Sequence, residues 1–141
     1  MIETEMAFVD TSVLIYSFDK TDIKKNKKSI NLLNDLISNK KLVLSNQILE
    51  EFTYVAIKKS NIPNNEIKKI IENLILTAKI LNYNEKTILN SLDISSKYNL
   101  HFWDSLIIAT MLENNIVTIY TENKKDFSKC NKIDVINPYE K

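Results

Sequence analysis

The sequence predicts an α/β domain in which helices cover both faces of a short, mainly parallel sheet. Short apolar segments of strand length alternate along the chain with longer segments whose apolar residues recur at helical spacing. Strands that are separated by helices run parallel, and a parallel sheet needs helices on both faces. The length of 141 residues suits one domain with a substantial core, and no repeat or linker divides residues 1–141.

Five short segments are expected to form the sheet, because each is apolar or extended in character and too short for a helix. In chain order they are residues 6–9, 42–44, 78–81, 116–120 and 133–136. The segment at 116–120 has the continuous apolar character of a strand that is buried on both faces.

Six segments between these strands are expected to be helical, because their apolar residues recur every three or four positions. The first helix is capped by Ser12 and runs through Tyr16, and the second follows the loop at residues 19–22 and ends near Ser38. The third runs from Ser45 or Asn46 to Lys59, and the fourth begins at Asn64 or Asn65. The fifth and sixth are residues 85–98 and 103–114. The second helix is supported by the apolar positions Ile30, Leu33, Leu36 and Ile37. The fourth is supported by Ile67, Ile70, Ile71, Leu74 and Ile75, and the fifth by Ile88, Leu89, Leu92 and Ile94.

The composition restricts the classes of protein to which the chain can belong. Hydrophobic residues make up 44% and charged residues 26%, which is ordinary for a folded protein, and the net charge of +1 says little about a polyanionic partner. Arginine and glycine are absent, so turns that need positive φ must use Asn or Asp. The lone Cys130 excludes an internal disulfide, and no apolar run is long enough to span a bilayer. We therefore expect a cytoplasmic protein.

Two aspartates stand where such a fold would place a functional site. Asp10 directly follows the first strand, and parallel sheets bind ligands beyond the carboxyl ends of their strands. A carboxylate there can bind a cation, although Asp10 could equally cap the helix that follows. Asp104 continues the apolar face formed by Ile107 and Ile108, where a carboxylate is costly without a cation or a helix N-terminus to compensate it. Trp103, beside it, is expected to pack.

Two further positions are expected to complete an acidic cluster. On the third helix, Glu51 falls at the edge of the apolar face and Glu50 points farther toward solvent, so we choose Glu51; two solvated glutamates remain the alternative. After the fourth strand, Glu122, Asn123 and Asp126 are all candidates for the fourth position, and we favour Asp126. The four positions come from separate segments that the predicted sheet would bring to one edge.

Clustered carboxylates suggest a particular chemistry. They would repel one another without a cation, and hard oxygen ligands select Mg²⁺ or Mn²⁺ rather than Zn²⁺. A site of this kind can lower the pKa of a bound water and orient that water for in-line attack on a phosphodiester. The sequence therefore indicates metal-dependent hydrolysis of a nucleic acid.

Four segments carry these acids, namely residues 8–16, 44–52, 102–109 and 120–127. In their content, order and spacing they resemble the motifs of PIN-domain ribonucleases, especially the VapC-type toxins of VapBC toxin–antitoxin pairs. The resemblance covers nearly the whole chain. It implies a PIN-like three-layer α/β/α sandwich, Mg²⁺- or Mn²⁺-dependent cleavage of RNA, a cognate antitoxin and a homodimer.

The resemblance also implies roles for individual residues. The catalytic and metal-binding acids carry over onto Asp10, Glu51, Asp104 and Asp126. The small polar residues beside those acids match Thr11, Ser12 and Thr121, which are expected to contact the substrate. Lys124 abuts the site and is expected to hold a phosphate of the RNA. One departure is Asn123, which stands where the fourth motif often has Asp.

Three hypotheses follow. The first is a metal-dependent endoribonuclease that acts as the toxin of a type II toxin–antitoxin pair. The second is a PIN-like module that binds RNA or a protein without cutting, which the imperfect fourth motif suggests. The third is a phosphoacceptor domain in which Asp10 takes a phosphoryl group. It ranks last, because the chain has no paired acid just before Asp10 and no well-placed lysine at a strand end.

Overall fold

The computed structural model describes residues 5–140 and contains a five-stranded parallel sheet with the strand order β3-β2-β1-β4-β5. The strands are β1 (Ala7–Val9), β2 (Leu42–Ser45), β3 (Lys79–Leu81), β4 (Thr118–Tyr120) and β5 (Asp134–Ile136). All five lie where the sequence predicts them. In the central strand β1, Ala7 pairs with Leu42 on one side and with Thr118 on the other, and all three residues of β1 are buried.

Seven helices connect the strands within the described residues. They are α1 (Thr11–Phe18), α2 (Ile23–Ser38), α3 (Asn46–Lys58), α4 (Asn64–Thr77), α5 (Glu85–Tyr98), α6 (Phe102–Glu113) and α7 (Lys124–Phe127). The short α7 is the one helix that the sequence analysis does not predict, because four residues are too few to show a helical period. The α/β class and its parallel sheet are confirmed.

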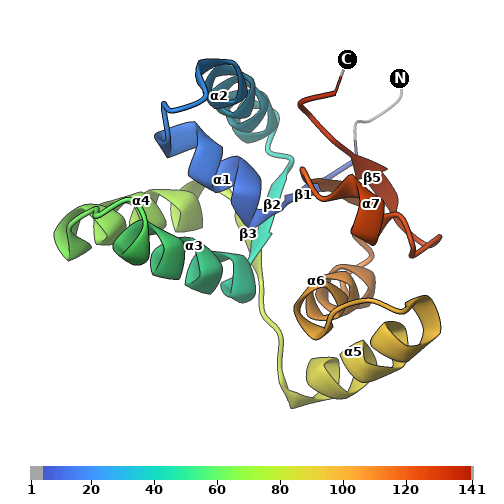
Figure 1. Cartoon of the computed structure of the whole chain (residues 1–141). Helices are drawn as coiled ribbons and strands as arrows, with labels where there is room; N and C mark the ends of the chain where they lie inside the picture. The colour runs from blue at the N-terminus through green and yellow to red at the C-terminus, as the bar shows by residue number, and fades with distance from the viewer. Residues whose placement is uncertain (1–4, 141) are drawn as a thin grey trace.

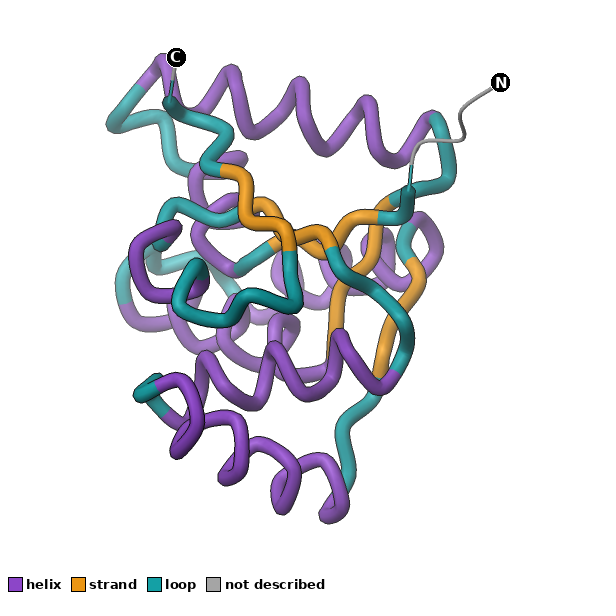
Figure 2. Tube along the Cα trace, turned by 90° about the vertical axis from the view of Figure 1, so that its right-hand side faces the viewer, coloured by secondary structure: helices purple, strands orange, loops and turns teal. Residues whose placement is uncertain are grey.

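The helices form two layers with the sheet between them. Figure 1 shows α1 to α4 gathered on one side of the strands and α5 and α6 on the other, and Figure 2 gives the same arrangement in a view turned by 90°. From β1 the chain proceeds through β2 to β3 at one edge, and it then crosses to β4 on the other side of β1. The point where the direction of winding changes therefore lies between β1 and β4, and ligands bind beyond the carboxyl ends of strands at such a point.

The cap of α1 corrects a prediction. Asp10, and not Ser12, is the N-cap residue: one of its carboxylate oxygens accepts a hydrogen bond of 2.8 Å from the backbone N–H of Thr11. Ser12 lies inside the helix. The first acid of the predicted site is therefore also the residue that starts α1, and the two interpretations of Asp10 are compatible.

Some apolar residues at helical spacing face solvent. Ile30, Ile75 and three residues of α5 are exposed, whereas the buried residues of α5 are Thr87 and Ser91. For α5 the reason is its contact with α6. Helix α5 packs against α6, in which every residue from Ser105 to Met111 is buried, and the small side chains on α5 let the two helices approach closely.

Positive φ angles occur at Lys40, Asn61, Asn99 and Asn115 in the described chain. Three of the four are asparagine, as expected for a chain without glycine, and Asn99 is the left-handed C-cap of α5. Lys40 is the exception to the expectation. Within residues 5–140, no helix is both long enough and apolar enough to cross a membrane.

Candidate active site

Asp10 lies at the carboxyl end of the central strand. Its backbone N–H donates to the carbonyl of Tyr120 at 3.0 Å, so the ends of β1 and β4 are joined at this point. One carboxylate oxygen accepts from the N–H of Thr11, and the other accepts from the hydroxyl of Thr121 at 2.7 Å. Burial raises the pKa of Asp10, and these two hydrogen bonds oppose that rise. Asp10 is therefore held in one orientation by residues from both strand ends.

Glu51 joins the site from α3. The hydroxyl of Thr11 donates to one of its oxygens at 2.8 Å, and the side-chain amide of Gln47 donates to the other at 3.4 Å. Burial raises the pKa of Glu51, and the negative charge of Asp10 raises it further. Glu50 is exposed and instead accepts a hydrogen bond of 3.2 Å from the hydroxyl of Tyr83. Of the two adjacent glutamates, Glu51 is the one that is linked to Asp10, through the hydrogen bonds of Thr11.

Asp104 comes from the first turn of α6. Burial, followed by the charges of Asp10 and Asp126, raises the pKa of Asp104 to about 6. The side-chain amide of Asn123 donates to Asp104 at 3.5 Å, and the backbone N–H of Asn123 donates to the hydroxyl of Thr121 at 3.0 Å. Because Thr121 in turn donates to Asp10, these bonds link Asp104 to the strand ends.

Hydrogen bonds thus connect carboxylates that lie 41 to 94 positions apart in the sequence. In spatial order the connected residues are Glu51, Thr11, Asp10, Thr121, Asn123 and Asp104. They come from the ends of β1 and β4, from α1, α3 and α6, and from the segment before α7. The sequence analysis did not foresee that Asn123 would be a link, since an asparagine after a strand carries no signal of its partner.

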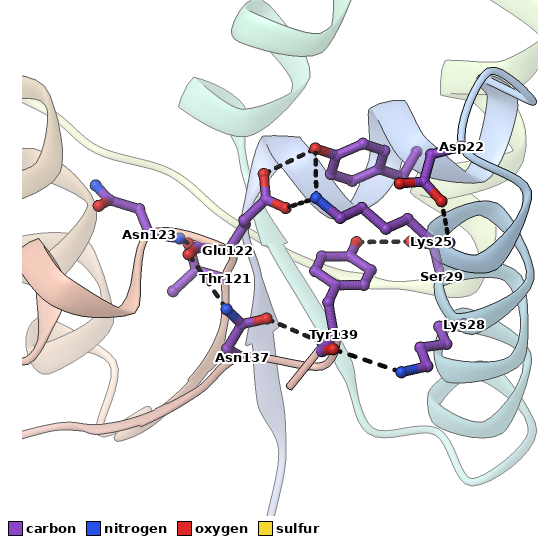
Figure 3. Close-up of polar contacts among 10 residues, drawn as sticks. Asp22, Lys25, Lys28, Ser29, Thr121, Glu122, Asn123, Asn137 and Tyr139 are labelled. Atoms are coloured by element: carbon purple, nitrogen blue, oxygen red, sulfur yellow. Dashed lines mark hydrogen bonds and ion pairs between the residues drawn. The ribbon is translucent and has the colours of Figure 1, made fainter. Parts of the chain in front are cut away.

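The three candidates for the fourth position differ in what they face. Glu122 accepts hydrogen bonds from the hydroxyl of Tyr16 at 2.8 Å and from the ammonium of Lys25 at 2.5 Å. Figure 3 shows the side chains of Glu122 and Asn123 pointing away from each other. Asp126 pairs with Lys129 at 3.6 Å, although its charge still acts on Asp104. Asn123 therefore reaches the acids by a hydrogen bond and Asp126 reaches them through its charge, whereas Glu122 faces α1 and α2.

The residues expected to contact substrate also have partners within the chain. Thr11 and Thr121 use their hydroxyls to bind the acids. Ser12 lies beside Asp10, and its buried hydroxyl oxygen has no hydrogen-bond partner among the described residues. Lys124 pairs with Glu140 at 3.5 Å, and both side chains are about half exposed.

A cleft of about 710 Å³ opens beside Asp10 and Glu51. Three aromatic side chains line it, namely Tyr54, Tyr83 and Trp103. The expectation that Trp103 packs is met only in part: its indole lies edge-on to the ring of Phe102, with centroids 5.0 Å apart, but the residue is 59% exposed. Gln47 also lines the cleft, and its amide nitrogen donates to the backbone carbonyl of Trp103 at 3.0 Å. Gln47 was missed in the sequence, where its position one turn before Glu51 was the available signal.

The donor set of the site suits a hard divalent cation. Asp10, Glu51 and Asp104 present carboxylate oxygens, and no lysine or histidine nitrogen among residues 5–140 forms an ion pair with any of them. Burial is the largest cause of the raised pKa of each of these acids, so their charged forms are costly without a cation. In the same part of the chain, no three His, Cys, Asp or Glu residues form a group that could hold a metal ion as they stand. The oxygen donors fit Mg²⁺ or Mn²⁺ in kind.

Comparisons with known proteins agree with the fold. The model of the PIN domain family matches residues 7–133 of the chain. Among solved structures, a toxin–antitoxin complex from Klebsiella pneumoniae aligns with a TM-score of 0.71 at 22% identity, covering 95% of this chain and 98% of that chain. DNA-bound VapBC from Salmonella typhimurium aligns with a TM-score of 0.70 at 17% identity, covering 96% of this chain and 99% of that chain.

A third similar structure is the Mycobacterium tuberculosis toxin VapC20, which cleaves the sarcin–ricin loop. It aligns with a TM-score of 0.64 at 17% identity and covers 86% of this chain and 92% of that chain. The comparison with curated proteins finds no match. At these identities the solved structures establish the similarity of the fold, and the family model establishes the relationship in sequence.

Proposed function

The chain belongs to the PIN domain family, and from this premise we propose that it is a divalent-metal-dependent endoribonuclease and the toxin of a type II toxin–antitoxin pair. One observation carries the proposal. Asp10, Glu51 and Asp104 are linked through hydroxyl and amide groups at the switch point of the sheet, and none has a lysine partner among the described residues. Uncompensated carboxylates at a ligand-binding edge are what a cation-dependent site requires.

In the proposed mechanism, Asp10, Glu51 and Asp104 hold the cation, and Asp126 adds negative charge beside them. A bound Mg²⁺ or Mn²⁺ supplies positive charge at the scissile phosphate and polarises water for hydrolysis. The hydroxyls of Thr11 and Thr121 fix the orientation of the carboxylates before substrate arrives. Such preorganisation avoids a reorganisation cost during the reaction.

RNA is the proposed substrate because of the family and because of a similar structure. VapC20 is a toxin that cleaves the sarcin–ricin loop. For this chain we propose cleavage of RNA in the cytoplasm, inhibition by a cognate antitoxin protein, and assembly as a homodimer. The solved complexes of toxin with antitoxin from other organisms support the antitoxin partner.

The proposal is tested by cleavage of structured RNA with and without Mg²⁺ or Mn²⁺. We expect EDTA to abolish cleavage, and Asp10→Asn and Asp104→Asn to reduce the rate about 10³-fold, which is the scale for loss of one strong electrostatic contact. Asp93→Asn, an exposed acid on α5, is the matched control and should retain full activity. Undiminished cleavage by Asp10→Asn would remove Asp10 from the mechanism.

A second candidate function is an RNA- or protein-binding module that does not cut. The ion pair between Asp126 and Lys129 and the amide at Asn123 favour it, because both weaken the fourth acidic position. Titration with Mn²⁺ distinguishes the two candidates. A folded protein whose Mn²⁺ affinity is unaffected by Asp104→Asn would support the non-cleaving module.

A further inference from the structure

We infer that the aromatic end of the cleft is a nucleobase subsite, in which an unpaired base of the RNA stacks on Trp103 beside Tyr54 while its phosphodiester lies at the acids. The inference rests on the proposed function and adds the feature of the RNA that is recognised. It makes an unstacked, single-stranded nucleotide the substrate, and it gives Trp103 a direct role in binding.

The cleft and the acidic site are continuous. Asp10 and Glu51 lie on the wall of the same cleft as Tyr54, Tyr83 and Trp103. Its volume of about 710 Å³ falls within the roughly 300–1,000 Å³ range of sites for small organic ligands. A nucleotide whose phosphate is at Asp10 therefore has its own base, or that of its neighbour, within reach of the aromatic side chains.

The aromatic rings are presented to solvent on a supported backbone. The side chain of Trp103 is 59% exposed and that of Tyr54 is 64% exposed. The carbonyl of Trp103 accepts from Gln47, and its indole packs edge-on against the ring of Phe102 with centroids 5.0 Å apart. One side of the indole is thus fixed by packing and the rest is open. A planar ring held in this way loses little conformational entropy when a base stacks on it.

The lining of the cleft favours a base over a phosphate. None of the ten lining residues is a lysine, whereas three of them are acids, namely Asp10, Glu50 and Glu51. A phosphate at the aromatic end would therefore meet negative charge without a cation. A neutral, flat base avoids that repulsion and offers N–H donors to the acceptors around it.

A free carboxylate oxygen favours a base over an apolar side chain of a protein. Glu50 is exposed and lines the cleft; one of its oxygens accepts from Tyr83, and its other oxygen remains available to an N–H donor. An apolar side chain that covered the rings would take water from this oxygen without offering a donor, which is costly.

The geometry also selects against double-stranded RNA. In a duplex both faces of each base are stacked and the pairing edges are occupied, so an aromatic side chain cannot reach a base face. Loops, bulges and single strands expose bases that stack on aromatic residues. The subsite therefore requires the target position to be unpaired.

The fluorescence of Trp103 provides a direct test, because it is the only tryptophan in the sequence. The probe is a short single-stranded RNA, added to the full chain with Ca²⁺ in place of Mg²⁺, and binding is followed separately by the anisotropy of a labelled strand. We expect the strand to quench the tryptophan emission. The same strand with abasic positions and a duplex of the same sequence should leave the emission nearly unchanged.

Substitutions test the role in turnover. Trp103→Leu should raise KM about tenfold, the effect of losing one base–aromatic stack, with kcat within about twofold of the original value. Trp103→Phe keeps a ring and should restore most of the loss, and Tyr54→Leu should have a smaller effect in the same direction. Phe18→Leu is the matched control, because Phe18 is an exposed aromatic residue that does not line the cleft.

The outcomes separate the inference from the function on which it rests. If Trp103→Leu cuts RNA with an unchanged KM, or if bound RNA leaves the emission of Trp103 unchanged, the inference is wrong and the ribonuclease stands. If the emission responds to a purified antitoxin and not to RNA, the cleft is a protein-docking site and the inference is again wrong. If no RNA is bound or cut by the original chain, the proposed function itself fails.

Discussion

The acids near the carboxyl end of the sheet fall into two groups that differ in their partners. Asp10, Glu51 and Asp104 accept hydrogen bonds from hydroxyl, amide or backbone N–H groups, and no lysine in residues 5–140 pairs with them. Glu122 and Asp126, which follow β4, are each paired with a lysine. Neutral donors orient a carboxylate without offsetting its charge, whereas an ammonium group offsets part of that charge; the charge of Asp126 still raises the pKa of Asp104.

Under the proposed function, the difference teaches that pairing with lysine, more than residue type, separates the acids that would bind a cation from those that serve the fold. Two like charges about 4 Å apart repel by roughly 4 kcal/mol at an effective dielectric constant near 20. No lysine among residues 5–140 offsets such repulsion in the first group, and it adds to burial, the larger cause, in raising the pKa of Asp104 to about 6. The predictions below test whether an external cation compensates the first group and whether the second group is complete without one.

The largest expected effect is stabilisation by a divalent cation. At a free Mn²⁺ concentration about 100 times Kd, binding adds about 2.7 kcal/mol to the free energy of unfolding, which for a chain of this size raises Tm by several degrees. Thermal unfolding with and without Mn²⁺ measures the shift. Asp104→Asn should lose most of it and Glu122→Gln should keep it. Equal shifts in the two variants would show that the groups do not differ.

A smaller effect is expected in the pH dependence of stability without metal. Folding raises the pKa of Asp104 from 3.8 to about 6, so the folded state holds its proton more tightly than the unfolded state. The contribution of Asp104 to the free energy of unfolding is therefore fully present below about pH 4, and it is lost as the pH rises through about 6. Because the carboxyl is partly solvated, we expect the loss to be about 1 kcal/mol.

Denaturant unfolding in EDTA at pH 4 and pH 7 measures this loss. The asparagine in Asp104→Asn cannot ionise, so this substitution should remove the part of the pH dependence that comes from Asp104. The variant should therefore be more stable than the original chain at pH 7. Asp10 and Glu51 contribute in the same direction, since their pKa values are also raised. A variant that is less stable than the original at pH 7 would contradict the assigned repulsion.

The smallest effect is expected at the paired acid Glu122. Its partner Lys25 lies over the rings of Tyr16 and Tyr139, and the hydroxyl of Tyr139 is bonded to Ser29 on α2. The cluster in Figure 3 thus joins the C-terminal segment to α1 and α2. Lys25→Met should lower Tm by only about 1–2 °C, because partly exposed ion pairs contribute little.

The same variant has an activity readout. RNA cleavage by Lys25→Met should stay within about twofold of the original rate, because the pair lies outside the linked acids. A loss of cleavage comparable to that of Asp10→Asn would place Glu122 and Lys25 in the site and remove the distinction between the two groups.

Much of the fold could be predicted from the sequence because its signals are local. Short apolar segments marked all five strands, and alternation with helices fixed their parallel direction. The faces of α5 could not be predicted in the same way. Thr87 and Ser91 are buried and Leu89 faces solvent, since the close approach of α6 decides which side is covered. That contact is a property of the pair of helices.

In the candidate site, too, residues with a local signal in the sequence could be predicted and residues defined by contacts across the fold could not. Asp10 and Asp104 were found because each stands at a position that strand ends or helix faces make unusual. Gln47 was not found, and Asn123 was only one of three candidates for the fourth position, because the importance of both lies in the residues they bond across the fold. The exposure of Trp103 was also hidden, since an aromatic residue beside a buried helix face suggests packing when only its neighbours in sequence are known.

The cap formed by Asp10 has a practical consequence. Asparagine caps a helix about as well as aspartate, so Asp10→Asn removes the negative charge and leaves an acceptor for the backbone N–H of Thr11. Alanine at the same position would remove the cap as well, at a cost of about 1 kcal/mol. We therefore expect the asparagine variant to fold and to bind RNA without cleaving it, so that it can serve as bait on which an intact transcript is cross-linked and sequenced.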